Sequence, residues 1–349
     1  MVEAQNRGVR FAGGGVVEPR IAPLYELAPE KVRVAVAYCG LCGSDRRLLE
    51  SGAAQVPGHE IAGVVAEVGE GASSTVGVGE RVVIYIPLFC GECGPCTEGW
   101  TNRCRRYTDL VGWQVDGGLE EVVDLPARVV VPVPADLELD VAVLALDTLG
   151  TSGHGLRMAM QALGRRPRSV YVIGCGPLGL GTLAVARELG VGDLFAFDLN
   201  RERLGAARQL GATMVDPGAT AADGYELVVD VTGSPVARSA GWAAVAPGGA
   251  LLLLGEGETG VELPSSVRWR RTDMFVIRSF YFPLREMDEN WRILRQCGSE
   301  LRDLMVTIHP FESLSRAFTA FREGSLLKPV IEVVRGDDWE RFRARPAQP

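Results

Sequence analysis

The sequence predicts an α/β protein with two domains, a mainly antiparallel β domain followed by a doubly wound parallel sheet. A chain of 349 residues is long enough for two hydrophobic cores, and 47% hydrophobic with 23% charged residues is typical of a folded globular protein. Short valine-rich segments dominate from about 30 to 135, and a regular alternation of strand and helix begins near 168. These observations predict both the class and the order of the domains.

The first region consists of short apolar segments that end at glycine or proline. They are "KVRVAVAY", "IAGVVAEVG", "ERVVIYI" and "LEEVVDLPARVVVPVP". Valine favours strands, and glycine and proline mark the turns between them. We therefore expect antiparallel strands joined by tight turns.

The second region alternates strands with helices. Its predicted strands are "RSVYVIG", "DLFAFD", "YELVVDVTG" and "GALLLLGEG", and its predicted helices span 177–189, 200–210 and 235–246. Repeated βαβ units of this kind form a parallel sheet. Two amphipathic helices and a closing strand, "KPVIEVV", follow from about 283, which gives predicted domains at 1–148 and 149–282 and a terminal segment at 283–349.

Charge and hydropathy exclude several classes of function. The net charge of −8 would repel nucleic acid and an anionic membrane surface, so we expect neither as a partner. The uncharged stretch at 169–186 is interrupted by glycines and a proline, and we expect no membrane span. The start, "MVEAQNRGVR", lacks the apolar core of a signal peptide, so we expect a cytoplasmic protein.

A loop at 89–104, "FCGECGPCTEGWTNRC", holds four of the eight cysteines, namely Cys90, Cys93, Cys96 and Cys104. A reducing cytoplasm disfavours disulfides and leaves metal or redox chemistry. In the bacterial ferredoxin spacing the fourth cysteine comes sooner and precedes proline, which is not the case here. Four thiolates leave no open position for substrate, so we expect a structural zinc, with free thiols as the alternative.

The segment "VYVIGCGPLGLG" predicts a dinucleotide site. Gly174, Gly176 and Gly179 form G-x-G-x-x-G, with Pro177 and Leu178 between the last two, directly after a strand and at the start of a helix. In this Rossmann context the first glycine permits a tight turn, the second lets the backbone approach a pyrophosphate, and the third lets helix and strand pack closely. Free N–H groups at the helix start bind the anion.

Asp198 ends the next predicted strand, nineteen residues after Gly179. A carboxylate there can accept hydrogen bonds from a ribose and repels a 2′-phosphate, which favours NAD over NADP. Arg201 and Arg203 lie nearby and could accommodate a phosphate. The alternative is that Asp198 only caps the helix that begins near Asn200.

Two further stretches, "CGLCGSD" at 39–45 and "PGHEIAGVVAEVG" at 57–69, supply Cys42 and His59. Thiolate and imidazole together suit zinc, and a catalytic zinc needs about three protein ligands and an open position. These two stretches, the cysteine loop and "GCGPLG" follow the order found in the zinc-dependent medium-chain alcohol and polyol dehydrogenases. The chain resembles that family over nearly its whole length.

The resemblance implies a GroES-like catalytic domain, to which the terminal segment returns, a Rossmann NAD-binding domain, and a homodimer or homotetramer. It implies that Cys42 and His59 bind catalytic zinc. The segment "ALDTLGTSGHG" resembles the aspartate version of the third ligand, which is Asp147 here. Glu60 resembles a carboxylate that can approach the metal. His154 matches a histidine of the family, although we expect it to be a packed helix residue.

The implied activity is hydride transfer between a secondary alcohol or polyol and NAD, with two zinc ions per chain and one of them acting as a Lewis acid. Ser44 corresponds to the hydroxyl that accepts the alcohol proton, and Asp45 to an acid that orients the ligands. Many relatives have a histidine three residues after this hydroxyl, but this chain has Arg47. Arginine cannot relay a proton, so Arg47 either interrupts the relay or binds an anionic or polyhydroxylated group.

Glu120, Glu121 and Trp113 lie in a segment that often borders the substrate pocket of the family, and a polar lining would suit a sugar, cyclitol or amino alcohol. A protein of the same fold that senses NAD or serves as a scaffold is the alternative function. A zinc-free quinone reductase is a further alternative. Cys42, His59, Ser44 and Asp147 argue against both.

Overall fold

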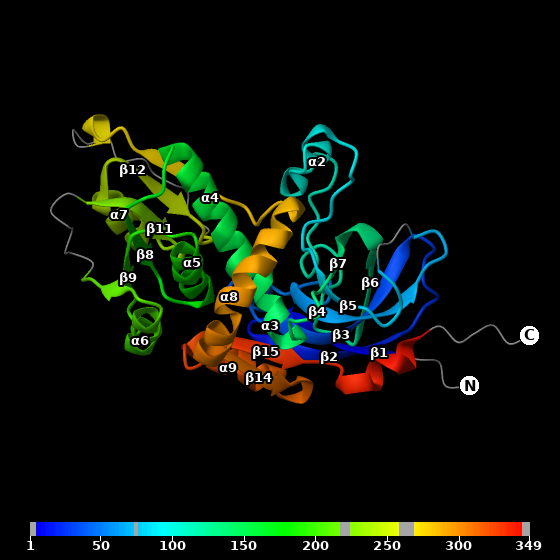
Figure 1. The fold of residues 1–349 in the computed structure, drawn as a ribbon. Helices are drawn as coiled ribbons and strands as arrows, with labels where there is room; N and C mark the ends of the chain where they lie inside the picture. Colours follow the sequence, from blue (N-terminus) through cyan, green and yellow to red (C-terminus); the bar gives the residue numbers. More distant parts are fainter. Residues whose placement is uncertain (1–4, 73–75, 217–223, 258–268, 344–349) are drawn as a thin grey trace, which may run out of the picture. The chain divides into compact units, whose positions relative to one another are not determined.

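The computed structural model describes residues 5–72, 76–216, 224–257 and 269–343. The chain forms two compact units, Met1–Leu146 with Val306–Pro349, and Asp147–Met305 (Figure 1). The first unit is mainly antiparallel β and the second is a parallel sheet with helices. The predicted α/β fold class is therefore confirmed.

A seven-stranded sheet organises the first unit. Six strands follow the order β14-β15-β3-β4-β5-β7, and β6 also pairs with β3. Their bounds are β3 Lys31–Gly40, β4 Glu60–Val68, β5 Arg81–Ile84, β6 Val122–Pro126, β7 Val130–Pro132, β14 Val306–Pro310 and β15 Lys328–Glu332. All pairs are antiparallel except β14 with β15. The sheet thus joins strands from both ends of the chain.

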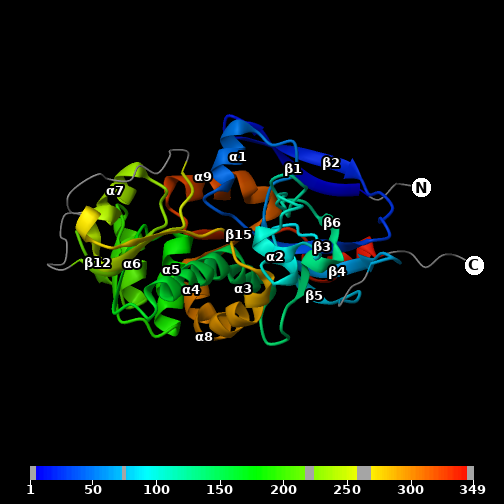
Figure 2. The same cartoon turned by 90° about the horizontal axis from the view of Figure 1, so that it is seen from above.

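The valine-rich pattern of β3 fits a central strand that is buried on both faces. Every residue from Val32 to Val36 is buried, so both faces of β3 are shielded from solvent. The hairpin β1 (Gln5–Gly13) and β2 (Val16–Pro23) was not predicted from the sequence. It lies beside α1 (Asp45–Ser51), where the Gly14 N–H donates to Glu50 O at 2.9 Å (Figure 2). The other helices of the unit are α2 Gly94–Thr97, α3 Leu139–Ala142 and α9 Leu314–Glu323.

The second unit is a six-stranded parallel sheet of order β10-β9-β8-β11-β12-β13. Its strands are β8 Ser169–Ile173, β9 Asp193–Phe197, β10 Thr213–Met214, β11 Tyr225–Asp230, β12 Val245–Leu253 and β13 Phe275–Arg278. Its helices are α4 Ser152–Leu163, α5 Pro177–Glu188, α6 Arg201–Gln209, α7 Pro235–Ala244 and α8 Met287–Met305. The order reverses between β8 and β11, and ligands of such sheets bind at the carboxyl ends of the strands where this happens.

The second unit extends beyond its expected end. The segment 283–349 was expected to return to the first domain, whereas the second compact unit continues to Met305, where α8 packs beside α5. Leu294 and Leu301, about two turns apart on the apolar face of α8, are buried. Among the described residues, no helix is long and apolar enough to cross a membrane.

Candidate functional site

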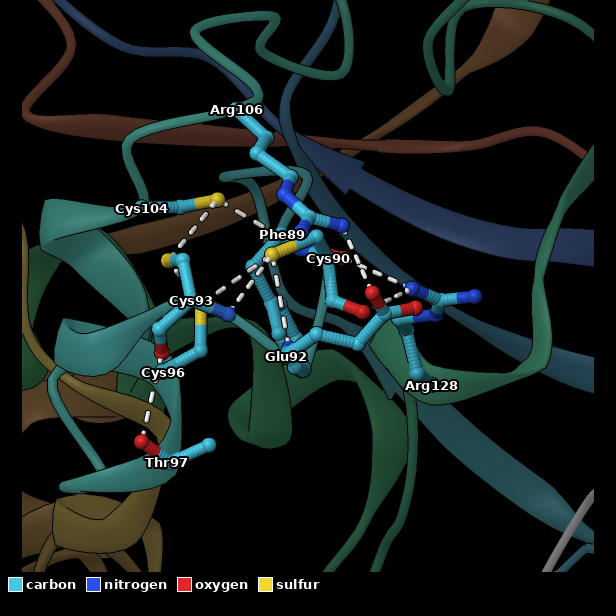
Figure 3. A network of polar contacts seen from close by, with 9 residues as sticks. All are labelled: Phe89, Cys90, Glu92, Cys93, Cys96, Thr97, Cys104, Arg106 and Arg128. Atoms are coloured by element: carbon cyan, nitrogen blue, oxygen red, sulfur yellow. Dashed lines mark hydrogen bonds and ion pairs between the residues drawn. The ribbon is translucent and has the colours of Figure 1, made fainter.

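The four-cysteine loop converges on one point. The sulfur of Cys93 lies 3.4 Å from that of Cys96 and 3.9 Å from that of Cys104, and the sulfurs of Cys90 and Cys96 are 4.0 Å apart (Figure 3). A tetrahedral zinc with Zn–S bonds of about 2.3 Å requires sulfurs about 3.8 Å apart. The donor set fits a four-thiolate zinc, and none of the eight cysteines, all of which are described, forms a disulfide.

Backbone N–H groups of the loop stabilise thiolates. The N–H groups of Glu92 and Cys93 donate to the Cys90 sulfur at 3.4 and 3.3 Å. Backbone hydrogen bonds lower the pKa of Cys93 to about 6, whereas burial raises that of Cys96 to about 12. Arg128 also fixes the loop, since its guanidinium donates to the carbonyls of Phe89 and Cys90 at 3.1 and 2.7 Å (Figure 3).

A second group of candidate ligands consists of Cys42, His59, Glu60 and Asp147, whose donor atoms lie within 4.8 Å of one another. Cys42 precedes α1, and His59 directly precedes β4. Asp147 is the first residue of the second unit and directly follows Leu146 of the first unit in the chain. One thiolate, one imidazole and carboxylates are a donor set that zinc accepts.

Asp45 holds two of these ligands from a fully buried position. Its Oδ2 accepts from the Cys42 N–H at 2.9 Å, and its Oδ1 lies 3.0 Å from His59 Nδ1. Burial would lower the pKa of His59, but Asp45 and Cys42 outweigh that effect and raise it. Since His59 Nδ1 faces Asp45, Nε2 is the ring nitrogen that would bind a metal. Carboxylates commonly orient histidine ligands of metals in this way.

Ser44 and Arg47 lie on the same short segment. The Ser44 hydroxyl donates to the Cys42 sulfur at 3.3 Å and makes no capping bond to α1, although Ser44 is the N-cap residue. Arg47 is exposed on α1, and its guanidinium carbon lies 4.8 Å from the centroid of the Trp113 ring. That ring is in turn 5.9 Å from the His59 ring. An aromatic side chain thus separates the arginine from a candidate ligand.

Asp147 begins a π-helix, Asp147–Thr151, that leads into α4. The hydroxyl of Thr151 donates to Asp147 Oδ1 at 2.7 Å. Short π-helices often occur at functional sites, because they turn one side chain out of the regular helical register. Sequence reasoning did not identify Thr151. Thr151 follows Asp147 by four residues, and in a helix this spacing places two side chains next to each other, so the sequence does contain a sign of this contact.

The glycine turn forms the expected local geometry. Gly174 has φ +99°, a left-handed conformation, and Gly179 packs so closely that a Cβ would lie 1.9 Å from Gly174 O. Gly176 is the N-cap of α5, Pro177 is its first residue, and Leu178 follows. A Cβ at Gly176 would meet no atom within 4 Å, so this side of the turn is open. The geometry fits a pyrophosphate at the helix start.

Asp198 fixes this turn. Its Oδ2 accepts from the Cys175 N–H and its Oδ1 from the Asn200 N–H, both at 2.7 Å. Asn200, rather than Asp198, is the N-cap of α6, because Asn200 Oδ1 accepts from the N–H groups of Glu202 and Arg203. Arg203 is half-buried on α6. Burial and the charge of Asp198 raise the pKa of Cys175 to about 12, although the charge of Arg203 opposes this rise.

Two polar residues expected near the substrate, Glu120 and Glu121, have other contacts. Glu120 is buried and accepts from Asn6 and Arg20 at 2.8 and 2.9 Å. Glu121, also buried, accepts from Arg7 Nε and Arg341 at 2.8 and 2.7 Å. Glu120 therefore holds the β1–β2 hairpin, and Glu121 joins the hairpin to Arg341. His154 is packed in α4, as expected, with Nδ1 at 3.0 Å from Glu286.

The known proteins that this chain resembles are dehydrogenases and reductases. Residues 28–135 match the alcohol dehydrogenase GroES-like domain. L-threonine 3-dehydrogenase of Bacillus subtilis (strain 168) is 32% identical over 334 residues, which are 88% of this chain and 93% of that protein. The probable D-xylulose reductase A of Aspergillus clavatus is 29% identical over 337 residues, covering 90% and 92%.

A solved structure, the alcohol dehydrogenase TADH from Thermus sp. ATN1, has a TM-score of 0.85 and 27% identity, covering 94% of this chain and all of that one. An antiparallel domain with two zinc-type donor sets and a Rossmann unit define a zinc-dependent oxidoreductase. The chain belongs to the zinc-dependent medium-chain dehydrogenases. It is an NAD-dependent alcohol or polyol dehydrogenase, which confirms the predicted activity and cofactors.

Proposed function

We propose that this enzyme oxidises a secondary alcohol that carries neighbouring polar groups, such as a polyol, sugar, cyclitol or amino alcohol, and that zinc bound by Cys42, His59 and Asp147 activates it. The observation that carries the proposal is the group of Cys42, His59, Glu60 and Asp147 donors, with the Ser44 hydroxyl 3.3 Å from the Cys42 sulfur. The named substrates of two relatives, threonine and xylulose, support this class.

When bound, zinc supplies Lewis acidity that makes the alcohol hydroxyl easier to deprotonate. The chain's own residues do the rest. Asp45 keeps the Cys42 backbone and the His59 ring in place. The Ser44 hydroxyl accepts the alcohol proton. NAD, when bound, would supply the nicotinamide ring as hydride acceptor. The glycine turn would hold its pyrophosphate, and Asp198 would bind its adenosine ribose.

The proton must leave through a group other than Arg47, because a guanidinium does not deprotonate near neutral pH. Arg47 is exposed beside Trp113, so water has access to this side of the segment. We propose that the relay ends at water, and that Arg47 binds a polar or anionic group of the substrate or cofactor. We also propose that the enzyme is a cytoplasmic homodimer or homotetramer.

The experiment is a panel of secondary alcohols, polyols and amino alcohols assayed for NADH formation by absorbance, with metal content measured on the same sample. We expect turnover with at least one compound and its loss in Cys42→Ser, which should retain the zinc of the four-cysteine loop. Two zinc ions and normal NAD binding, without turnover of any compound, would instead indicate an NAD-sensing protein.

A further inference from the structure

A buried lysine lies next to the candidate ligands. Lys328, the first residue of β15, is 1% exposed, and its Nζ donates to Glu60 Oε1 at 2.5 Å and to Leu41 O at 3.1 Å. Glu60 is fully buried. The lysine therefore contacts one candidate ligand directly and the residue before another, Cys42.

The sheet explains how this pair forms. Glu60 on β4 and Val330 on β15 both pair with Gly40, so the two outer strands lie on either side of β3 and about 10 Å apart. A side chain at the position of Gly40 on β3 would keep the side chains of Glu60 and Lys328 apart. A Cβ at Gly40 would lie 2.7 Å from Glu60 Oε2, so glycine is what leaves room for the carboxylate to extend toward Lys328.

The residue type is informative as well. Only two of the 36 lysine and arginine residues are lysines, Lys31 and Lys328. Lysine carries a compact charge on a flexible stem, whereas arginine carries a broad planar fork. A buried ion pair adds little net stability, because both charges lose their hydration. A buried lysine in a chain that otherwise uses arginine therefore points to a role in the site that it contacts.

We propose that Lys328 is a positioning residue that holds Glu60 back from the metal and so keeps the coordination position meant for substrate open. This inference rests on the proposed zinc site. Cys42, Asp147 and Glu60 bring three negative charges to one group of donors. Lys328 neutralises the negative charge of the Glu60 carboxylate through their 2.5 Å contact. Without the lysine, the carboxylate moves onto the metal and occupies the open position.

The test follows metal coordination and needs no substrate. Cobalt(II) replaces zinc, and imidazole, a neutral ligand for an open coordination position, is titrated while the cobalt absorption is recorded. Lys328→Met should weaken imidazole binding at least tenfold and change the cobalt spectrum before imidazole is added. Lys328→Met/Glu60→Gln should restore both, because a neutral amide is a poor ligand. The four-cysteine site is an internal reference, and Lys31→Met is the matched control.

Wild-type imidazole affinity in Lys328→Met would overturn the proposal, as would a double variant as impaired as the single one. If Lys328→Met does not fold, Glu60→Gln and the double variant decide. If Lys328 acts only through the Glu60 carboxylate, it has no role in a protein that already carries Glu60→Gln. Adding Lys328→Met to Glu60→Gln should therefore change the imidazole affinity less than twofold. A larger change shows an independent role. Failure to find an alcohol substrate would leave these metal measurements intact, so the two proposals fail separately.

Discussion

Ser44 begins α1, yet its hydroxyl contacts the Cys42 sulfur instead of capping the helix. A serine at a helix start is ordinarily a cap, and the sequence alone does not distinguish the two roles. The structure places this hydroxyl beside a candidate metal ligand, and its role in proton transfer stays a prediction.

Ser44→Ala should retain both zinc ions and NAD affinity but lower kcat by about 10²- to 10⁴-fold, because the hydroxyl acts mainly as the proton moves. Steady-state kinetics, metal analysis and NAD titration measure the three quantities. Ser51→Ala, on the same helix, is the control and should leave kcat unchanged, since Ser51 bonds only to Gly52 O in the contacts described. An unchanged kcat in Ser44→Ala would rule out the proton role.

Arg47→His should introduce a titrating group at the end of the relay. We expect kcat to fall below a pKa near the ordinary histidine value of about 6.5, because a protonated imidazole can no longer accept the proton. The pH–rate profile from pH 5 to 9 measures this, with Arg46→His on the neighbouring exposed position as the control. A flat profile, together with a raised KM in Arg47→Ala, would show that this position does not reach the proton relay and that Arg47 serves only to bind substrate or cofactor.

Asp198 both closes the glycine turn and carries the charge expected to exclude a 2′-phosphate. Asp198→Ala should raise the ratio of NADP to NAD efficiency at least tenfold, about 1.4 kcal/mol, and weaken NAD binding because the turn loses two backbone hydrogen bonds. Efficiencies with both coenzymes measure the ratio. Asn200→Ala removes the α6 cap without changing charge and should leave the ratio unchanged. An unchanged ratio in Asp198→Ala would limit Asp198 to the turn.

At the scale of elements, the helices α5, α6 and α7 begin and end within two residues of the sequence predictions. Amphipathic helices between apolar strands repeat a strong pattern, so periodicity alone identifies them. The β1–β2 hairpin was missed because its strands alternate weakly and gain their stability from contacts far along the chain, such as those of Asn6 with Glu120. No local pattern contains that information.

The hairpin contact also predicts a pH dependence of stability. Burial raises the pKa of Glu120 to about 8, with Asp116 adding to the rise and Arg20 opposing it, from an ordinary value of 4.5. The folded protein therefore binds an extra proton between these values. The stability associated with this proton is fully present below pH 4.5 and is lost as the pH rises through about 8.

Glu120→Gln should remove this loss. Between pH 5 and 9 we expect the free energy of unfolding of the wild type to decrease by about 2 to 4 kcal/mol more than that of the variant. Urea unfolding at several pH values measures the difference. Glu18→Gln, an exposed hairpin residue paired with Arg10, is the control and should follow the wild type. Parallel curves for wild type and Glu120→Gln would contradict the assignment.

For the whole molecule, cysteine spacing alone predicted the four-cysteine group, because that spacing is local and specific. Asp147 and Glu60 of the second group were expected only from the resemblance to the family. The sequence did not predict Lys328, whose partner Glu60 is 268 residues away. A lysine at the start of the mainly apolar segment "KPVIEVV" was the available sign. Contacts between distant strands depend on sheet order, which the sequence pattern leaves open.

Purified protein should hold two zinc ions per chain. Cys104→Ser should reduce this to one and lower the melting temperature, because metal binding in a closed site contributes free energy to folding. Metal analysis and thermal unfolding measure both effects, and Cys297→Ser, a buried cysteine outside both groups, is the control for zinc content. Two zinc ions remaining in Cys104→Ser, or loop thiols that react readily with thiol reagents in the wild type, would exclude the structural site.

The sheet of the first unit includes β14 and β15, which follow the whole second unit in the chain. During synthesis the ribosome therefore releases every residue of the second unit before the first can complete its sheet. Domains fold as they emerge, so the Rossmann unit is expected to be the first to reach its native state. During that time the edge of β3 that pairs with β15 has no partner strand. Until Lys328 emerges, Glu60 has no lysine beside it, and the nascent chain is exposed to aggregation and to premature metal binding.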